Sequence, residues 1–224
     1  MDFGVNWRPT KTPNNEDTVM SVSLREINLQ EVTLKIRGTS ALIQHAWSSK
    51  GLREMRRTKS ERALHKKQNP PKTRNPEEEA EDATHRMKDN GYGVPVTAIK
   101  ASIISAAHKD LGIEKTAVKK SLFLIADEGD LVRMTCSEPI VREDIVRIGM
   151  GSTDLRYRPQ FDDWEVEITA QVDADILSAD ILANLVKRAG FGVGIGEWRP
   201  EKGGDFGRFE IDQEFGIKFS GGNK

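Results

Sequence analysis

The chain has 224 residues, of which 37% are hydrophobic, and its formal net charge is −1. This length lets one domain bury a large core without disulfides, and the single cysteine, Cys136, makes no internal disulfide. The charge argues against a histone-like binder. No apolar run approaches the length of a membrane span, and the N-terminus lacks a signal-peptide pattern. We therefore expect a cytoplasmic protein without a membrane partner.

Charge is separated along the chain although its total is near zero. Residues 50–74 hold ten lysines and arginines against two acids, and an acidic run follows at 77–82. This pattern predicts a basic helix over 50–67, a break at Pro70-Pro71, and a second helix over 76–89 that begins after Asn75. We expect residues 48–90 to form a charged helical insertion. Residues 1–20 are polar and turn-rich, which predicts a flexible arm.

The other segments alternate between strand and helix patterns. Residues 31–37 and 164–173 alternate apolar and polar side chains, which predicts half-buried strands. Residues 97–110 and 178–189 have apolar residues at helical spacing, with Thr97 and Ser178 as caps, and a short helix is expected at 114–120. The run SLFLIA is too short to assign. Two alternating stretches within 131–148, and residues 206–219, read as further strands.

The predicted order is strand, insertion, helix, strands, strand, helix, glycine-rich loop and strand. It is neither a regular βα alternation nor an all-β pattern. The simplest arrangement is an α+β fold with a ferredoxin-like (RRM-like) antiparallel sheet and helices on one face. Residues 21–224 then form a single domain that carries the insertion.

Residues 190–211, GFGVGIGEWRPEKGGDFGRFEI, are called the glycine-rich segment below. Seven glycines fall within eighteen residues, together with three cations and the rings of Trp198 and Phe206. Glycine lets backbone N–H groups approach a ligand closely, while cations and rings suit phosphate contact and base stacking. The segment lacks the P-loop pattern, and it follows a helix rather than a strand, unlike a dinucleotide fingerprint. The alternative is a hairpin with its rings in the core.

Two further basic regions are candidates for phosphate contact. Residues 142–158 hold four arginines around Gly149-Met150-Gly151, which favours a phosphate-contacting loop with Tyr157 or Met150 against a base. The alternative there is a solvated hairpin. The basic helix at 50–67 would follow a phosphate backbone or reach a neighbouring subunit. Its alternative is a solvated helix paired with the acidic run.

Two separate segments resemble the RAMP superfamily, the ferredoxin-fold RNA-binding subunits of CRISPR effector complexes and their processing enzymes. The stretch GIGEWRPEKGGDFGRFEI is similar to their C-terminal glycine-rich loop, with Asp205 as an extra residue. The stretch PVTAIKASI, residues 95–103, is similar to a motif of their backbone subunits, with Val96 where a glycine is usual. The segment from Val32 to Trp47 fits the family's first strand. The resemblance covers about half of the chain.

The resemblance implies a non-catalytic subunit that binds single-stranded nucleic acid, RNA in preference to DNA, without a cofactor. Its partners would be copies of itself or other subunits of a ribonucleoprotein complex or filament. The expected binding residues are Lys100, Arg142, Arg147, Met150, Arg156, Arg158, Trp198, Arg199, Lys202, Gly204, Phe206, Gly207 and Arg208. A secondary basic patch comprises Lys50, Arg53, Arg56 and Arg57. We also expect Gly207→Val to abolish binding with little loss of fold.

Two other functions remain open. A metal-independent endoribonuclease would use His45 as its acid–base residue, although His45 has no evident partner in the sequence. RAMP backbone subunits that cut target RNA use an aspartate after the first strand, and residues 37–53 contain none, so the resemblance argues against metal-assisted cleavage. No histidine has metal-ligand spacing to another histidine or cysteine. Alternatively, the protein mimics such a subunit and binds only protein. Arg199→Glu with Arg208→Glu would then leave its activity intact.

Overall fold

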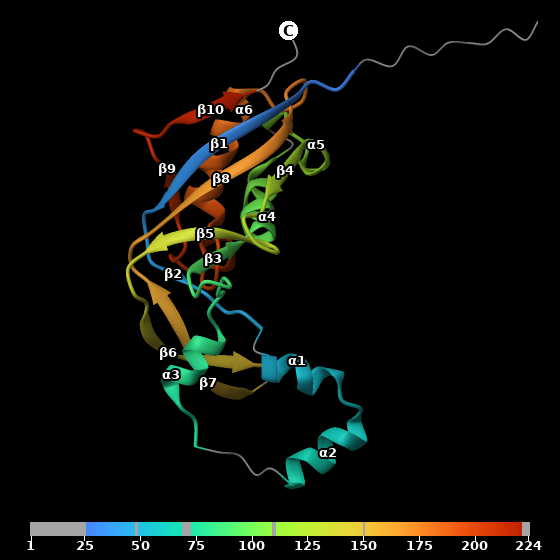
Figure 1. The fold of residues 1–224 in the computed structure, drawn as a ribbon, viewed down its shortest axis with the longest axis vertical. Helices are drawn as coiled ribbons and strands as arrows, with labels where there is room; N and C mark the ends of the chain where they lie inside the picture. Colours follow the sequence, from blue (N-terminus) through green and yellow to red (C-terminus); the bar gives the residue numbers. More distant parts are fainter. Residues whose placement is uncertain (1–25, 48, 69–72, 109–110, 150, 221–224) are drawn as a thin grey trace, which may run out of the picture.

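The computed structural model describes residues 26–47, 49–68, 73–108, 111–149 and 151–220. The predicted arm at 1–20 lies outside the described residues. Figure 1 shows a large sheet at one end of the molecule and a smaller sheet with three helices at the other. No helix in the described part of the chain is long and apolar enough to cross a membrane.

The large sheet has the ferredoxin-like topology. Its strand order is β10 (Ile217–Ser220), β1 (Leu29–Gly38), β8 (Trp164–Asp173), β5 (Leu131–Cys136) and β3 (Tyr92–Pro95), with β4 (Leu122–Ile125) on β8 and β9 (Phe209–Ile211) on β1. All of these pairings are antiparallel. In chain order, β1, α4 (Val96–Ala106), β4 with β5, β8, α6 (Ala179–Arg188) and β9 with β10 form a βαββαβ unit. The α+β prediction is confirmed.

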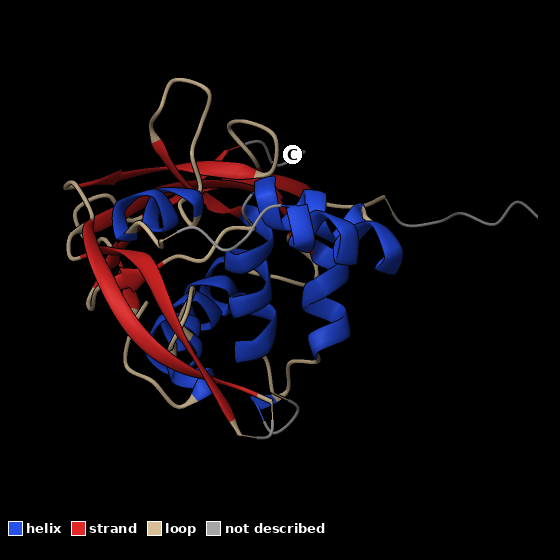
Figure 2. Ribbon diagram, turned by 90° about the horizontal axis from the view of Figure 1, so that it is seen from below, coloured by secondary structure: helices blue, strands red, loops and turns tan. Residues whose placement is uncertain are grey.

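The core lies between one face of this sheet and its helices (Figure 2). Alternate residues of β1 and β8, such as Val32, Ile36 and Ile168, are buried, as the period-two pattern predicts. They belong to one apolar cluster with Ile99 of α4 and Leu185 of α6. The intervening residues of the strands face the other side, which none of the described helices covers (Figure 2). That side is called the open face below.

The smaller sheet consists of β2 (Leu42–Ile43), β7 (Ser152–Phe161) and β6 (Ile140–Ile148). Residues 142–148 and 152–158 lie on the two strands of the β6–β7 hairpin, where Arg147 is exposed and Arg158 is buried. The insertion supplies α1 (Ser49–Arg56), α2 (Lys59–Gln68) and α3 (Pro76–Asp82) beside this sheet (Figure 1).

Several predicted helix boundaries were wrong for local reasons. The basic helix divides because the Thr58 N–H and hydroxyl both donate to Glu61 and start a new helix. Helix α3 begins after Asn75 as predicted but ends at Asp82 rather than 89. Helix α4 is preceded by Pro95 instead of a Thr97 cap. Ser178 caps α6 as expected, but Gly190 does not end it, because one π turn continues to Val193.

Candidate nucleic-acid interface

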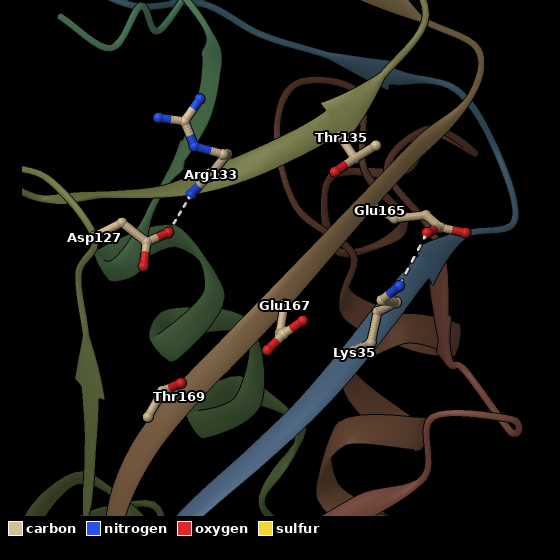
Figure 3. Close-up of a pocket in the computed structure, with 7 residues that line it drawn as sticks. All are labelled: Lys35, Asp127, Arg133, Thr135, Glu165, Glu167 and Thr169. Carbon is tan, nitrogen blue, oxygen red and sulfur yellow. Dashed lines mark hydrogen bonds and ion pairs between the residues drawn. The ribbon is translucent and has the colours of Figure 1, made fainter. Parts of the chain in front are cut away.

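The open face of the sheet carries a shallow hollow of 350 Å³ lined by polar side chains (Figure 3). Its cations are neutralised. Glu165 lies 3.5 Å from the Lys35 ammonium and accepts a 2.6 Å hydrogen bond from Arg37. Arg37 also donates to Asp212, and Arg133 donates to Asp89, both at 2.7–2.8 Å. These pairings leave little positive potential for phosphate on this face.

A different cavity joins the two segments that resemble RAMP proteins. It has a volume of 420 Å³ and lies between α4, α5 (Lys115–Ser121) and the glycine-rich segment. We call it the groove. Its lining comprises Ala98, Ala101, Ser102, Ile104, Ser105, Lys115, Lys119, Val193, Gly194, Ile195, Gly196, Arg199 and Glu201.

The groove forms because small residues meet glycines there. Ala98, Ala101, Ser102 and Ser105 have the spacing of one helix face, so α4 presents a low surface to the glycine-rich segment. Gly194 and Gly196, with φ of 72° and 77°, hold backbone conformations that favour glycine. Together these residues bring main chain, rather than bulky side chains, to the wall of the groove.

Positive charge at the groove is only partly compensated. Glu201 accepts from Arg199 at 2.8 Å and from the Ser105 hydroxyl at 2.5 Å. Among the described residues, neither Lys115 nor Lys119 has an ion-pair partner, and both are exposed. The groove therefore combines two available ammonium groups with main chain and small side chains, a composition suited to a sugar–phosphate strand.

Within the glycine-rich segment, several glycines are required by packing. The Gly207 N–H donates to the Ala41 carbonyl at 2.7 Å, and its own carbonyl accepts from Ile195 at 3.0 Å. A Cβ on Gly207 would lie 1.8 Å from the Ile195 oxygen, and one on Gly204 would lie 1.9 Å from the Trp198 oxygen. This packing contradicts the expectation that Gly207→Val leaves the fold intact. Both sequence alternatives hold in part, since residues 193–195 and 207 are buried and 198–206 lie at the surface.

The rings and cations of this segment have unequal freedom. Trp198 is partly exposed and has a φ of 52°, an unusual conformation for a bulky residue. Phe206 is covered by the Arg142 guanidinium, 4.7 Å from its ring centroid. Arg208 lies 5.1 Å from the ring of Phe191. Lys202 is exposed.

The hairpin arginines are mostly held by carboxylates. Arg142 donates to Asp144 at 2.8 Å, and Arg156 lies 3.5 Å from Asp154. Arg158 is only 2% exposed, 3.7 Å from Asp144 and 3.8 Å from Glu197, and burial lowers its pKa. Arg158 is therefore a poor candidate for direct phosphate contact. Arg147 is exposed near the tip, and Met150 lies outside the described residues.

The remaining predicted cations lie away from the groove. Lys100 is on the side of α4 opposite Ala98 and Ser102, with its ammonium 4.5 Å from the centroid of Phe123. The secondary patch of Lys50, Arg53, Arg56 and Arg57 lies on and just after α1. Figure 1 places α1 at the far end of the molecule from α5. The structure thus brings only Arg199 of the predicted cations to the groove.

His45 has a partner that the sequence did not reveal. Its Nδ1 lies 3.8 Å from a carboxylate oxygen of Glu197. The His45 imidazole beside it lowers the pKa of Glu197, and the nearby Arg158 lowers it further. Within the described part of the chain, no group of three or more histidine, cysteine or acidic residues is arranged to hold a metal ion.

Sequence reasoning missed the residues that define the groove. Lys115 and Lys119 stand four residues apart on α5, a spacing that places them on the same side of a helix. Ser102 is 3% exposed, and its hydroxyl has no hydrogen-bond partner. The spacing of the small residues at 98, 101, 102 and 105 was visible in the sequence, but the element packed against them was not.

Comparisons with known proteins find matches among solved structures. No family model matches the sequence, and no curated protein matches it. Among solved structures, the chain is similar to one in a cryo-EM structure of type III-B Cmr-beta bound to cognate target RNA. The identity is 10%, the TM-score is 0.46, and the match covers 86% of this chain and 61% of that one. The chain thus spans less than two thirds of that neighbour's length.

Proposed function

We propose that this protein is a non-catalytic subunit that binds single-stranded nucleic acid, RNA in preference to DNA, in the groove. The observation that carries the proposal is the meeting of three features at one cavity: α4, the glycine-rich segment, and two lysines that form no ion pair within the described part of the chain. Phosphates would contact Lys115 and Lys119, while main chain around Gly194–Gly196 would lie against the sugar–phosphate strand. The two segments that resemble RAMP proteins are those that form the walls.

The protein would work with copies of itself or with other subunits. The outer strand of the small sheet, β6, has β7 on one side and no described strand on the other. Ile145 on that strand is 73% exposed. An unpaired strand edge with an exposed apolar residue is a surface that favours association.

A charge-reversal pair tests the proposed function. Lys115→Glu with Lys119→Glu should weaken binding of a fluorescent single-stranded RNA by about tenfold or more at moderate salt. It should also reduce the slope of log affinity against log salt by about 1.4, since each single-strand phosphate contact contributes about 0.7. Fluorescence anisotropy over a salt series measures both quantities.

The matched control is Arg133→Glu with Lys218→Glu, which removes the same charge from the open face. This control should bind within about twofold of wild type, because the open face takes no part. Equal losses in both variants would show that only net charge matters and would contradict the groove as the site. Absence of binding by the wild-type protein would end the proposal.

The His45–Glu197 contact favours a second candidate function, metal-independent RNA cleavage. A carboxylate beside an imidazole orients the ring and supports acid–base catalysis. Labelled RNA incubated with EDTA should then be cut by wild type and by the Lys88→Glu control, but not by His45→Ala or Glu197→Gln. If the RNA stays intact in every sample, the ribonuclease hypothesis is rejected and the binding-subunit hypothesis is kept.

A further inference from the structure

A second hollow lies between the β6–β7 hairpin and the insertion, outside the groove and the open face. Its volume is 600 Å³. It is lined by two rings, Trp47 and Tyr157, and by polar side chains that include His45, Arg156 and Asp82. We call it the hairpin pocket.

One wall of the hairpin pocket is a free strand edge. The short strand β2 pairs only with Gln160 and Phe161 of β7, and Gln44 adds one 3.2 Å bond to the Pro159 carbonyl. The chain then leaves β7 for α3, where the Ala46 N–H donates to Ala83 at 2.7 Å. Beyond that point, no strand in the described residues pairs with this edge.

The free edge presents main-chain groups to the pocket. In an antiparallel ladder, alternate residues direct both N–H and C=O to the same edge of the strand. Tyr157 therefore directs its N–H and C=O to the edge that the Pro159 carbonyl faces. Tyr157 also lines the hairpin pocket, and none of the backbone hydrogen bonds between described residues outside the ladders involves it.

The charges of the pocket disfavour phosphate. Asp154 contacts Arg74 at 3.2 Å and Arg156 at 3.5 Å, so both guanidinium groups are paired. Asp82 has no ion-pair partner among the described residues. Beside this wall, Trp47 is 69% exposed. An exposed indole beside an adjacent backbone donor and acceptor, without excess positive charge, suits a flat uncharged heterocycle.

The hairpin pocket and the groove are linked through two consecutive residues, Gly196 and Glu197. Gly196 lines the groove. The next residue, Glu197, donates its N–H to the Ile43 carbonyl at 2.9 Å and holds His45, which lines the hairpin pocket. A strand lying in the groove would therefore reach the hairpin pocket by passing over Gly196 and Glu197.

We propose that the hairpin pocket takes one nucleobase of the single strand whose backbone lies in the groove. The base stacks on Trp47, and its edge pairs with the main chain of Tyr157. This inference rests on the proposed function. It adds a base-reading site to a surface that otherwise contacts only the backbone.

The test compares an intact RNA oligonucleotide with a set of oligonucleotides, each of which lacks the base at one position along the strand. For wild type, an abasic nucleotide at the pocket should weaken binding about five- to hundredfold, the range for stacking of one base. In Trp47→Ala this abasic penalty should disappear, whereas Trp47→Phe should keep most of it. Phe123→Ala, which removes an exposed ring from β4, should keep the full penalty.

The outcomes separate the two proposals. Loss of binding in Lys115→Glu with Lys119→Glu, together with an unchanged abasic penalty in Trp47→Ala, leaves the proposed function standing and overturns the pocket. Equal weakening of intact and abasic RNA by Trp47→Ala assigns the indole a structural role and also overturns it. The pocket proposal is also overturned if Trp47→Ala abolishes self-association but keeps the abasic penalty. That result would assign the pocket to a protein contact.

Discussion

The groove and the open face both carry cations on the same ferredoxin-like framework, but they differ in how those cations are held. On the open face, Glu165 engages Lys35 and Arg37 together, and Arg133 has Asp89. At the groove, Lys115 and Lys119 extend from a short helix and form no ion pair with any residue that the structure describes, although Glu201 lines the same cavity. The number of basic residues is therefore a poor guide to a binding surface, and their pairing is a better one.

The same contrast applies to the glycines of the glycine-rich segment. Gly207 has a φ of 65° and backbone at 1.8 Å from a would-be Cβ, whereas Gly192 has open space around it. Glycine at 207 lets its backbone approach that of Ile195, and this close approach shapes the groove. Glycine at 192 has no such constraint in the structure.

The largest effect is expected from these two glycines. Gly207→Ala should lower the free energy of unfolding by more than about 2 kcal/mol, because a left-handed conformation and a backbone clash add together. Gly192→Ala should change it by less than about 1 kcal/mol. Urea unfolding followed by circular dichroism measures both. A Gly207→Ala protein as stable as wild type would show that the approach of Gly207 to Ile195 is looser than described.

The features of the fold that the sequence predicted are those that depend on interactions between residues close together in the chain. The strand 164–173 and the Ser178 cap depend on neighbours within a few residues, so pattern alone gave them. The strand at 152–161 was anticipated only within the hairpin alternative, because Arg156 and Arg158 interrupt its apolar alternation. The strand at 92–95 was missed, because its pairing depends on partners distant in the chain, such as Val94 with Val132.

The candidate site followed the same rule. The glycine-rich segment and residues 95–103 were both selected from local composition. Lys100 was selected with them, but helix geometry turns it toward Phe123. The position of Lys115 and Lys119 at the groove depends on α5 packing beside α4, a tertiary contact that no local pattern encodes. The ion pairs that occupy Arg142 and Arg158 were hidden for the same reason.

The next largest effect is expected on RNA affinity, when the cations of the open face lose the carboxylate that pairs with them. Glu165→Gln removes the carboxylate that Lys35 and Arg37 share. If pairing keeps this face inactive, the variant should bind single-stranded RNA about two- to fivefold more tightly at low salt, and the gain should vanish at high salt. Thr169→Val, a neutral change on the same strand, is the control. Unchanged affinity at low salt would show that pairing is not what silences the open face.

The smallest effect concerns the Glu197 carboxylate at the boundary between groove and hairpin pocket. Its pKa is lowered in the folded protein, so it contributes stability above the ordinary carboxyl pKa and loses that contribution as pH falls through the folded value. Glu197→Gln should be destabilised by no more than about 1 kcal/mol at pH 7, because the group is half-exposed. The difference from wild type should shrink below about pH 4.5.

Urea unfolding of both proteins at pH 7 and pH 4 checks this sign. A difference that grows at the lower pH would contradict the ion-pair account of Glu197. If the difference in stability is the same at both pH values, the glutamine at position 197 acts by disturbing the packing around Arg158 and not by removing a charge.

The central claim is that the strand lies in the groove and not on the open face. Photo-cross-linking of the wild-type protein to RNA that carries 4-thiouridine, followed by peptide mass spectrometry, tests it most directly. The account predicts cross-linked peptides from 96–106 and 193–202. Cross-links confined to β5, β8 and β10 would contradict it.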